Sequence, residues 1–227
     1  MVRHDYFITG TDTEIGKTFI ACALLRKLKR QGIAAIGMKP VAAGTRLIDG
    51  EEINEDVAAL LEASSLPAPL GLVNPYCFPE PVAPHLAARR HRRAIDLQHI
   101  RSCFHALCEA SSAVIVEGVG GFRVPLNDTE DSADLAVALD LPVILVVGVR
   151  LGCINHALLT AEAIQARGLR LAGWVANTVE PHMQLRQENV AALKERINAP
   201  LLGVVPHVAN SDVELGANAL GGFPTAA

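Results

Sequence analysis

Short, wholly apolar segments alternate along this chain with longer segments in which apolar residues return every three or four positions. The apolar segments have the length and β-branched character of parallel strands that are covered on both faces. We expect such strands at residues 7–9, 34–38, 113–116, 142–148, 171–177 and 200–206. The helical spacing predicts helices at about 16–31, 54–61, 97–109, 132–139 and 183–197. A further helix is expected after a loop at 151–156 and ends at 168. Alternation of strand and helix implies right-handed crossovers. The pattern therefore predicts an α/β fold: a doubly wound, mostly parallel sheet flanked by helices on both faces.

Some segments follow neither pattern. Residues 46–54 are polar and contain glycine, which predicts a mobile loop. Residues 66–85 are rich in proline, which is incompatible with a helix interior or a central strand. Because they are too apolar for a disordered linker, we expect an ordered loop over the carboxyl edge of the sheet. The tail after Asn210 is short and glycine-rich, and we expect it to fray. No repeat or boundary divides residues 1–227, which predicts a single domain.

Composition narrows the class of protein. Half of the 227 residues are hydrophobic, which is enough for a sizeable core, and the net charge of −4 argues against a general nucleic-acid binder. The basic run at 89–93 is typical of a solvated loop. The five cysteines form no C-x-x-C pair, as expected for reduced thiols in the cytoplasm. The longest apolar run, 141–149, contains a proline and is too short to span a bilayer, and no signal peptide precedes the first strand. We therefore expect a cytoplasmic protein that contacts neither membrane nor nucleic acid.

The loop after the first strand carries the clearest functional signal. Gly10 ends the strand, and Gly16-Lys17-Thr18 opens the following helix. Backbone N–H groups at such a helix start bind phosphate, while the lysine reaches the β- and γ-phosphates and the threonine reaches Mg²⁺. Five residues separate the glycines here, whereas the usual pattern has four. The alternative is a plain strand–helix turn with a surface lysine. That alternative does not explain why Gly-Lys-Thr stands at the start of the helix, directly after a hydrophobic strand.

Further polar residues lie at or just beyond the carboxyl ends of strands, namely Lys39, Glu117, Asn155 and Asn177. Ligands of doubly wound sheets bind at that edge. Lys39 would add a second cation there, unless it is an ordinary solvated lysine. Glu117 resembles the acid that holds Mg²⁺ in phosphate-loop enzymes, directly or through water, and the alternative is an acid that caps a neighbouring helix. For Asp56, spacing alone favours a first-turn carboxylate stabilised by the helix dipole over a metal ligand.

Several motifs together point to one family. They are GTDTEIGKT at 10–18, KPVA at 39–42, NPY at 74–76, EGVGG at 117–121, the strand 142–148 followed by LGCINH at 151–156, and GWVAN at 173–177. From Tyr6 to about Pro206 this combination resembles the dethiobiotin synthetase family. In that family the loop with five residues between its glycines is the usual form.

The resemblance implies an enzyme that uses ATP and Mg²⁺ to carboxylate and cyclise 7,8-diaminopelargonic acid. One amine of this substrate takes up CO₂ as a carbamate, and the carbamate attacks the γ-phosphate of ATP. The second amine then displaces phosphate from the mixed anhydride and closes the ring of dethiobiotin. The protein's share is mostly positioning and charge neutralisation. The resemblance also implies a homodimer.

The same resemblance implies roles for individual residues. The implied catalytic residues are Thr13, Lys17 and Lys39. The implied ATP contacts are Thr13, Glu14, Ile15, Gly16, Lys17, Thr18, Asn177 and Pro206. The implied Mg²⁺ ligands are Thr18, Asp56 and Glu117, which replaces the helix-dipole interpretation of Asp56. The implied substrate contacts are Thr13, Lys39, Glu117, Gly120, Leu151, Gly152 and Asn155, of which the last three belong to a loop that meets the substrate carboxylate in the other subunit. Ala43 stands where the best-known members carry a serine, so one hydroxyl contact is missing.

Two other classes stay open at this point. A regulatory nucleotide-binding domain would bind ATP without turnover. A partitioning-type ATPase would bind a protein partner or a membrane, but that class typically has an extra lysine early in the loop, and residues 11–15 contain none. The sequence also lacks a basic amphipathic helix at its end. ATP turnover that requires both the diamine and CO₂ would separate the three.

Overall fold

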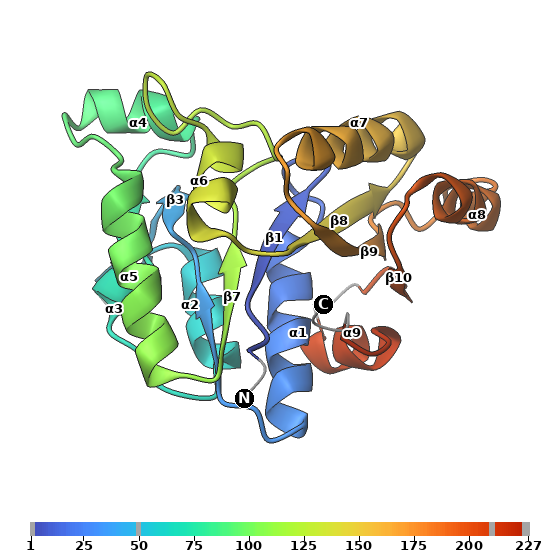
Figure 1. The fold of residues 1–227 in the computed structure, drawn as a ribbon, viewed down its shortest axis with the longest axis horizontal. Coiled ribbons are helices and arrows are strands. Elements are labelled where there is room, and N and C mark those ends of the chain that lie inside the picture. The colour runs from blue at the N-terminus through green and yellow to red at the C-terminus, as the bar shows by residue number, and fades with distance from the viewer. Residues whose placement is uncertain (1–2, 49–50, 209–211, 224–227) are drawn as a thin grey trace.

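The computed structural model describes residues 3–48, 51–208 and 212–223. The strands of its main sheet are β1 (Tyr6–Gly10), β2 (Ala35–Met38), β7 (Ala113–Glu117), β8 (Val143–Val149), β9 (Leu171–Thr178) and β10 (Leu201–Val205). Within the described residues they form a six-stranded parallel sheet in the order β10-β9-β8-β1-β7-β2 (Figure 1). The central position of β1 brings the carboxyl ends of β7 and β8 to either side of the loop that follows it. The predicted doubly wound α/β fold is confirmed.

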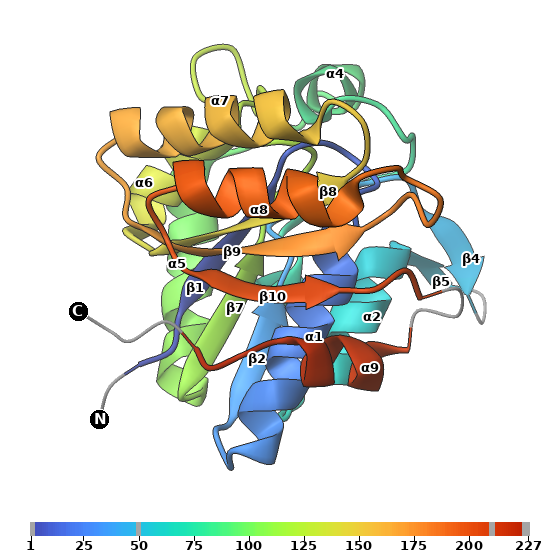
Figure 2. The same ribbon diagram turned by 90° about the vertical axis from the view of Figure 1, so that its right-hand side faces the viewer.

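Helices cover both faces of this sheet (Figure 2). One face carries α1 (Lys17–Arg30), α2 (Glu55–Ala63) and α9 (Val213–Ala219), and the other carries α5 (Leu97–Ala110), α6 (Ser132–Leu139), α7 (Cys153–Ala166) and α8 (Arg186–Arg196). Successive strand residues point to opposite faces, so Phe7 packs with the α5–α8 side and Ile8 with the α1 side. Every residue of β1 and β7 is buried, which explains their continuous apolar sequences. None of the described helices is long and apolar enough to cross a membrane.

The start of α2 is held by a side-chain cap. The Asn54 side chain accepts hydrogen bonds from the backbone N–H groups of Asp56 and Val57, at 3.1 and 3.3 Å. Its amide nitrogen donates to the carbonyl oxygen of Gly44 at 2.7 Å. Asn54 therefore links the start of α2, which carries Asp56, to Gly44.

Two segments expected to be loops contain regular structure. The predicted mobile loop at 46–54 forms an antiparallel hairpin of β4 (Arg46–Ile48) and β5 (Glu51–Ile53), with residues 49 and 50 outside the described part. The proline-rich segment at 66–85 contains α3 (Leu70–Val73), β6 (Tyr76–Phe78) and the start of α4 (Pro84–Arg90). Its strand pairs with β3 (Val41–Ala43), outside the main sheet, and Pro84 occupies the first turn of α4, where a missing N–H costs nothing. The loop predictions are therefore wrong in detail, because these short strands form through pairing with other strands, which the local sequence does not show.

The chain's end is also more regular than predicted. Residues 213–219 form α9, which packs on α1, and Leu220 makes an antiparallel bridge with Gly203 of β10. The predicted fraying is wrong for these residues, whereas 209–211 and 224–227 lie outside the described part. Apolar contacts supplied by α1 compensate for the glycine-rich composition of the tail.

Candidate active site

The phosphate loop joins the end of β1 to the start of α1. Glu14 and Gly16 both have left-handed backbone conformations, with φ of 56° and 84°. A Cβ on Gly16 would lie 2.3 Å from Nδ2 of Asn177, so only glycine fits there. In the described structure no side chain caps the start of α1. The first N–H groups of α1 and the positive end of its dipole are thus directed at the position that a phosphate would take.

Contacts to the neighbouring strands hold this loop in place. The backbone N–H of Thr11 donates to the carbonyl of Val146 at 3.0 Å, and the side chain of Asn177 donates to the carbonyl of Ile15 at 2.8 Å. Ile15 is only 1% exposed, so its side chain anchors the loop in the core. A Cβ on Gly148 would lie 2.5 Å from a methyl carbon of Ile15, which explains the glycine at that position. Ile15 can therefore contact a nucleotide only through its backbone.

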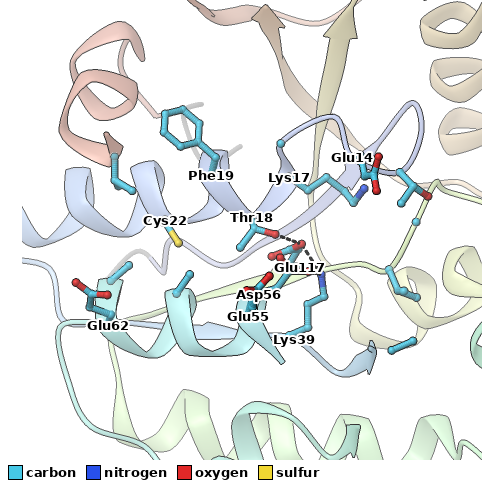
Figure 3. A pocket seen from close by; sticks show the side chains of 18 of the residues that line it. Glu14, Lys17, Thr18, Phe19, Cys22, Lys39, Glu55, Asp56, Glu62 and Glu117 are labelled. Carbon is cyan, nitrogen blue, oxygen red and sulfur yellow. Dashed lines mark hydrogen bonds and ion pairs between the residues drawn. The ribbon is translucent and has the colours of Figure 1, made fainter. Parts of the chain in front are cut away.

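A buried charge cluster lies beside the loop (Figure 3). The Lys39 ammonium lies 2.6 Å from Oε1 of Glu117 and 2.7 Å from Oδ2 of Asp56. Thr18 donates its hydroxyl to the same Oε1 of Glu117 at 2.8 Å. The Lys39 and Glu117 side chains are 5% and 1% exposed, whereas that of Asp56 is 43% exposed. Lys39, which directly follows β2, thus meets residues of α1, α2 and β7 at one point.

The position of Lys39 itself depends on a residue to which the sequence assigned no role. Asn74, which is buried, donates to the carbonyl oxygen of Lys39 at 2.6 Å and to that of Tyr76 at 3.1 Å. Asn74 belongs to the NPY motif, so its motif was visible in the sequence. Its partner, 35 positions away, was not.

The lysines of the site differ in their electrostatic surroundings. Burial lowers the pKa of Lys17 to about 8, despite the opposing attraction of Glu117. Burial acts in the same direction on Lys39, but Glu117 and Asp56 outweigh it and hold the pKa of Lys39 above its ordinary value. Burial likewise opposes the charge of Asp56, yet Lys39 holds the pKa of that carboxyl below its usual range. Lys39 and Asp56 therefore stay ionised at neutral pH, and an anion beside Lys17 would favour the charged form of that lysine.

The donor set of the cluster fits a magnesium ion. Among the described residues Oε2 of Glu117 is buried and has no hydrogen-bond partner, so one carboxylate oxygen is left for a further contact. Thr18 and Asp56 add oxygen donors, which are the ligands that Mg²⁺ prefers. No group of three or more His, Cys, Asp or Glu residues suited to a metal occurs in the described chain. A site of two carboxylates, a hydroxyl and phosphate oxygens is compatible with that result.

Most of the predicted site residues surround one cavity of about 730 Å³. Its lining includes Thr13, Glu14, Gly16, Lys17, Thr18, Lys39, Ala43, Asp56, Glu117 and Gly120. An adjoining cavity of about 240 Å³ is lined by Asn177 and Pro206 and shares Glu14, Gly16 and Phe19 with the first. The predicted phosphate and base regions are therefore contiguous. A nucleotide has room for its base beside Asn177 and for its phosphates over Lys17.

The three predicted residues of the 151–156 segment lie elsewhere. Leu151, Gly152 and Asn155 line neither of these cavities, and Leu151 is 88% exposed. In the described chain these three residues therefore do not join the rest of the predicted site.

The larger cavity also extends along α1 past the predicted residues. Cys22 and Arg26 follow Thr18 at intervals of four, so all three lie on one side of the helix, facing Ala59 and Glu62 of α2. Burial raises the pKa of Cys22 to about 12, which keeps it a neutral thiol. The helical spacing from Thr18 was the available signal for this part of the cavity.

The fold and the site define the class of the protein: a phosphate-loop nucleoside triphosphatase domain. A family model described as "AAA domain" matches residues 4–214. MinD of Aquifex aeolicus superimposes with a TM-score of 0.58 at 14% identity, covering 96% of this chain and 87% of that one. A ParA family ATPase from Chlorobium tepidum superimposes with a TM-score of 0.56 at 13% identity, covering 96% of this chain and 91% of that one. At such low identity these likenesses show the fold alone.

Sequence comparison is more specific. The chain is 61% identical over 207 residues to the ATP-dependent dethiobiotin synthetase BioD of Aromatoleum aromaticum, covering 91% of this chain and 92% of that one. It is 55% identical to the protein of the same name from Janthinobacterium, covering 89% of this chain and 88% of that one. It is 52% identical to the protein of the same name from Ralstonia nicotianae, covering 96% of this chain and 95% of that one. The chain belongs to the dethiobiotin synthetase family.

Proposed function

We propose that this chain is an ATP-dependent dethiobiotin synthetase of biotin biosynthesis. It would convert 7,8-diaminopelargonic acid, CO₂ and ATP into dethiobiotin, ADP and phosphate. The observation that carries the proposal is the 61% identity, over nine-tenths of both chains, to a protein of that name. The phosphate loop and the ion pairs of the buried Lys39 with Glu117 and Asp56 support the ATP-dependent part.

Each chemical step gives the chain's residues a task. One substrate amine adds to CO₂ and loses a proton, and the resulting carbamate oxygen attacks the γ-phosphorus of ATP while ADP leaves. The second amine then attacks the carbonyl carbon. The bond between that carbon and the phosphate oxygen breaks, phosphate leaves with its electron pair, and the ring closes as the amine loses a proton. In this scheme Lys17 and the loop N–H groups hold the phosphates, and Lys39 neutralises the carbamate and the transferred phosphoryl group. Thr13 and Gly120, which line the same cavity, would contact the substrate.

Thr18, Asp56 and Glu117 would hold Mg²⁺, and the ion would supply positive charge that neutralises the phosphates of ATP. In the described structure the Lys39 ammonium forms ion pairs with both carboxylates, so it holds them in a fixed orientation. Asn177 and Pro206 would form the base pocket. Because the Asn177 amide nitrogen donates to Ile15, its oxygen is the atom left to accept from an exocyclic amine such as that of adenine.

The proposal includes a homodimer in the cytoplasm, in which Leu151, Gly152 and Asn155 meet the substrate carboxylate bound in the partner subunit. A largely exposed Leu151 supports an interface at this loop, since an isolated leucine side chain gains by being covered. The fold is shared with MinD and ParA proteins, but the loop residues 11–15 carry no lysine, so a partitioning-type ATPase is not favoured.

The deciding experiment measures ATP turnover in the presence and absence of the diamine and of bicarbonate, with ¹³C-bicarbonate followed into the product by mass spectrometry. We expect phosphate release only when both are present, and one ¹³C per dethiobiotin. The Lys17→Ala variant should lose at least about 100-fold in turnover, because a charge-stabilising donor is removed. Hydrolysis of ATP that ignores the diamine would contradict the proposal.

A further inference from the structure

Asp12, in the middle of the phosphate loop, makes three contacts that bear on the site. One oxygen of its carboxylate accepts from the backbone N–H of Thr13 at 2.8 Å, and the other pairs with the guanidinium of Arg150. Its carbonyl oxygen accepts from the Lys17 ammonium at 2.8 Å. The orientation of Asp12 therefore bears on both Thr13 and Lys17, which line the cavity.

Arg150 reaches Asp12 from a second functional segment. It directly follows β8 and directly precedes Leu151 and Gly152, and Gly152 is the N-cap of α7. Across the described residues, Asp12 is the ion-pair partner found for Arg150. The backbone of Thr11 is bonded to the same strand. One side chain thus connects the phosphate loop to the 151–156 segment, although 138 positions separate it from Asp12.

We propose that Arg150 is a positioning residue that acts through Asp12 to orient Thr13 and Lys17 for ATP, and that the same ion pair holds the 151–156 segment in place. The second half rests on the proposed function, in which that segment serves the partner's substrate. Arg150 touches no reacting atom; it fixes the geometry of residues that do.

The exposure of the pair makes this testable. The two side chains are 43% and 44% exposed, and an ion pair of that kind contributes little to folding stability. Its loss should leave the fold intact. A small displacement of the loop, in contrast, lowers the rate of phosphoryl transfer strongly, because that step depends on the alignment of the reacting groups.

The test is a double-mutant cycle with Arg150→Gln and Asp12→Asn, the latter chosen because the amide that replaces the carboxylate keeps an oxygen for the Thr13 N–H. We expect each single variant to lower kcat/KM for ATP about tenfold, and the double variant to be no worse than either. Arg150→Lys should recover most of the loss. Additive losses in the double variant would mean that the two residues act separately and would overturn the proposal.

A matched control and a direct binding measurement separate this idea from the proposed reaction. Arg89→Gln breaks another exposed tertiary ion pair, with Asp128, and should change nothing. The dissociation constant of Mg·ATP, measured without diamine, should rise in Arg150→Gln whether or not the chain makes dethiobiotin. An unchanged constant together with unchanged turnover would overturn the positioning role. Turnover that ignores the diamine would instead refute the proposed function.

Mixed dimers test the second half. In a dimer of one Arg150→Gln subunit and one Lys17→Ala subunit, isolated with two different tags, the working site combines the altered phosphate loop with an intact partner segment. KM for ATP should stay raised while KM for the diamine returns to the wild-type value. An Arg150→Gln homodimer with the wild-type KM for the diamine would show that the ion pair does not hold the segment, and this half would be wrong. A raised KM that persists in the mixed dimer would mean that the segment serves its own subunit, which refutes the shared site of the proposed function.

Discussion

Buried charge dominates the site at the scale of single residues. Lys39 and Glu117 are nearly inaccessible to water and lie 2.6 Å apart, so each makes the burial of the other tolerable. The same pair has a proposed chemical role and a structural one. A single substitution therefore mixes two effects, and a second one is needed to separate them.

We expect Lys39→Met to cost about 3 kcal/mol of unfolding free energy, because it leaves the Glu117 charge buried without its partner. The double variant Lys39→Met/Glu117→Gln should regain much of that stability while remaining inactive. Denaturant titration and a turnover assay measure the two quantities on the same samples. A double variant as unstable as the single one would show that the lost charge pair is not the cause.

Glu117→Gln tests the metal role. The variant keeps the shape of the side chain and removes its charge, and we expect the Mg²⁺ concentration for half-maximal turnover to rise about tenfold. A Mg²⁺ titration at saturating ATP measures it. Glu188→Gln, an exposed glutamate of α8, serves as the control. An unchanged titration would make Glu117 a structural residue or a substrate contact.

At the scale of elements, α9 illustrates how a short helix is stabilised by docking. The carbonyl of Leu202 accepts from the N–H of Gly221 at 2.6 Å, and Gly203 bridges to Leu220. A seven-residue helix is marginal by itself, so the packing against α1 and these backbone bonds hold it.

Gly203→Ala should therefore destabilise this end of the molecule. A Cβ at that position would lie 2.4 Å from the carbonyl oxygen of Ala219, and backbone cannot move away as a side chain can. We expect a loss of about 1–3 kcal/mol, seen as a lower urea midpoint. Gly222→Ala is the matched control, because a Cβ there meets no atom within 4 Å. Equal midpoints for the two variants would contradict the close approach.

At the scale of the whole molecule, the proposed dimer places one segment of each subunit in the other's site. If so, Lys17→Ala and Asn155→Ala should complement each other. In a mixed dimer one site receives both defects and the other receives neither. Co-expression in equal amounts makes about half of the dimers mixed, so about a quarter of wild-type activity should return, by the symmetry of a two-fold interface.

The control for that experiment is each variant expressed alone and mixed after folding, when subunits stay paired. Activity should then equal the sum of the separate variants. Verified mixed dimers that show no gain would mean that the 151–156 segment completes the site of its own subunit.

The amino-acid sequence by itself determined the class of fold, the phosphate loop and the family. These features depend on local patterns: buried parallel strands need continuous apolar runs, and a phosphate-binding helix start needs Gly-Lys-Thr at fixed spacing. The resemblance to dethiobiotin synthetases, carried by motifs such as EGVGG at 117–121, is confirmed by the relatives. The roles assigned to individual site residues stay predictions, although the cavity gathers most of them.

Only the tertiary structure decided which distant groups meet. Spacing favoured a plain helix-start carboxylate for Asp56, yet folding brings it to Lys39. Asn74 was part of a motif without a role until its bond to the Lys39 carbonyl was visible, and Arg150 drew no attention until it reached Asp12. The docked α9 and the β4–β5 hairpin escaped prediction for the same reason. Local propensity depends on neighbours in the chain, whereas ion pairs, caps and short strands depend on partners that only the fold supplies.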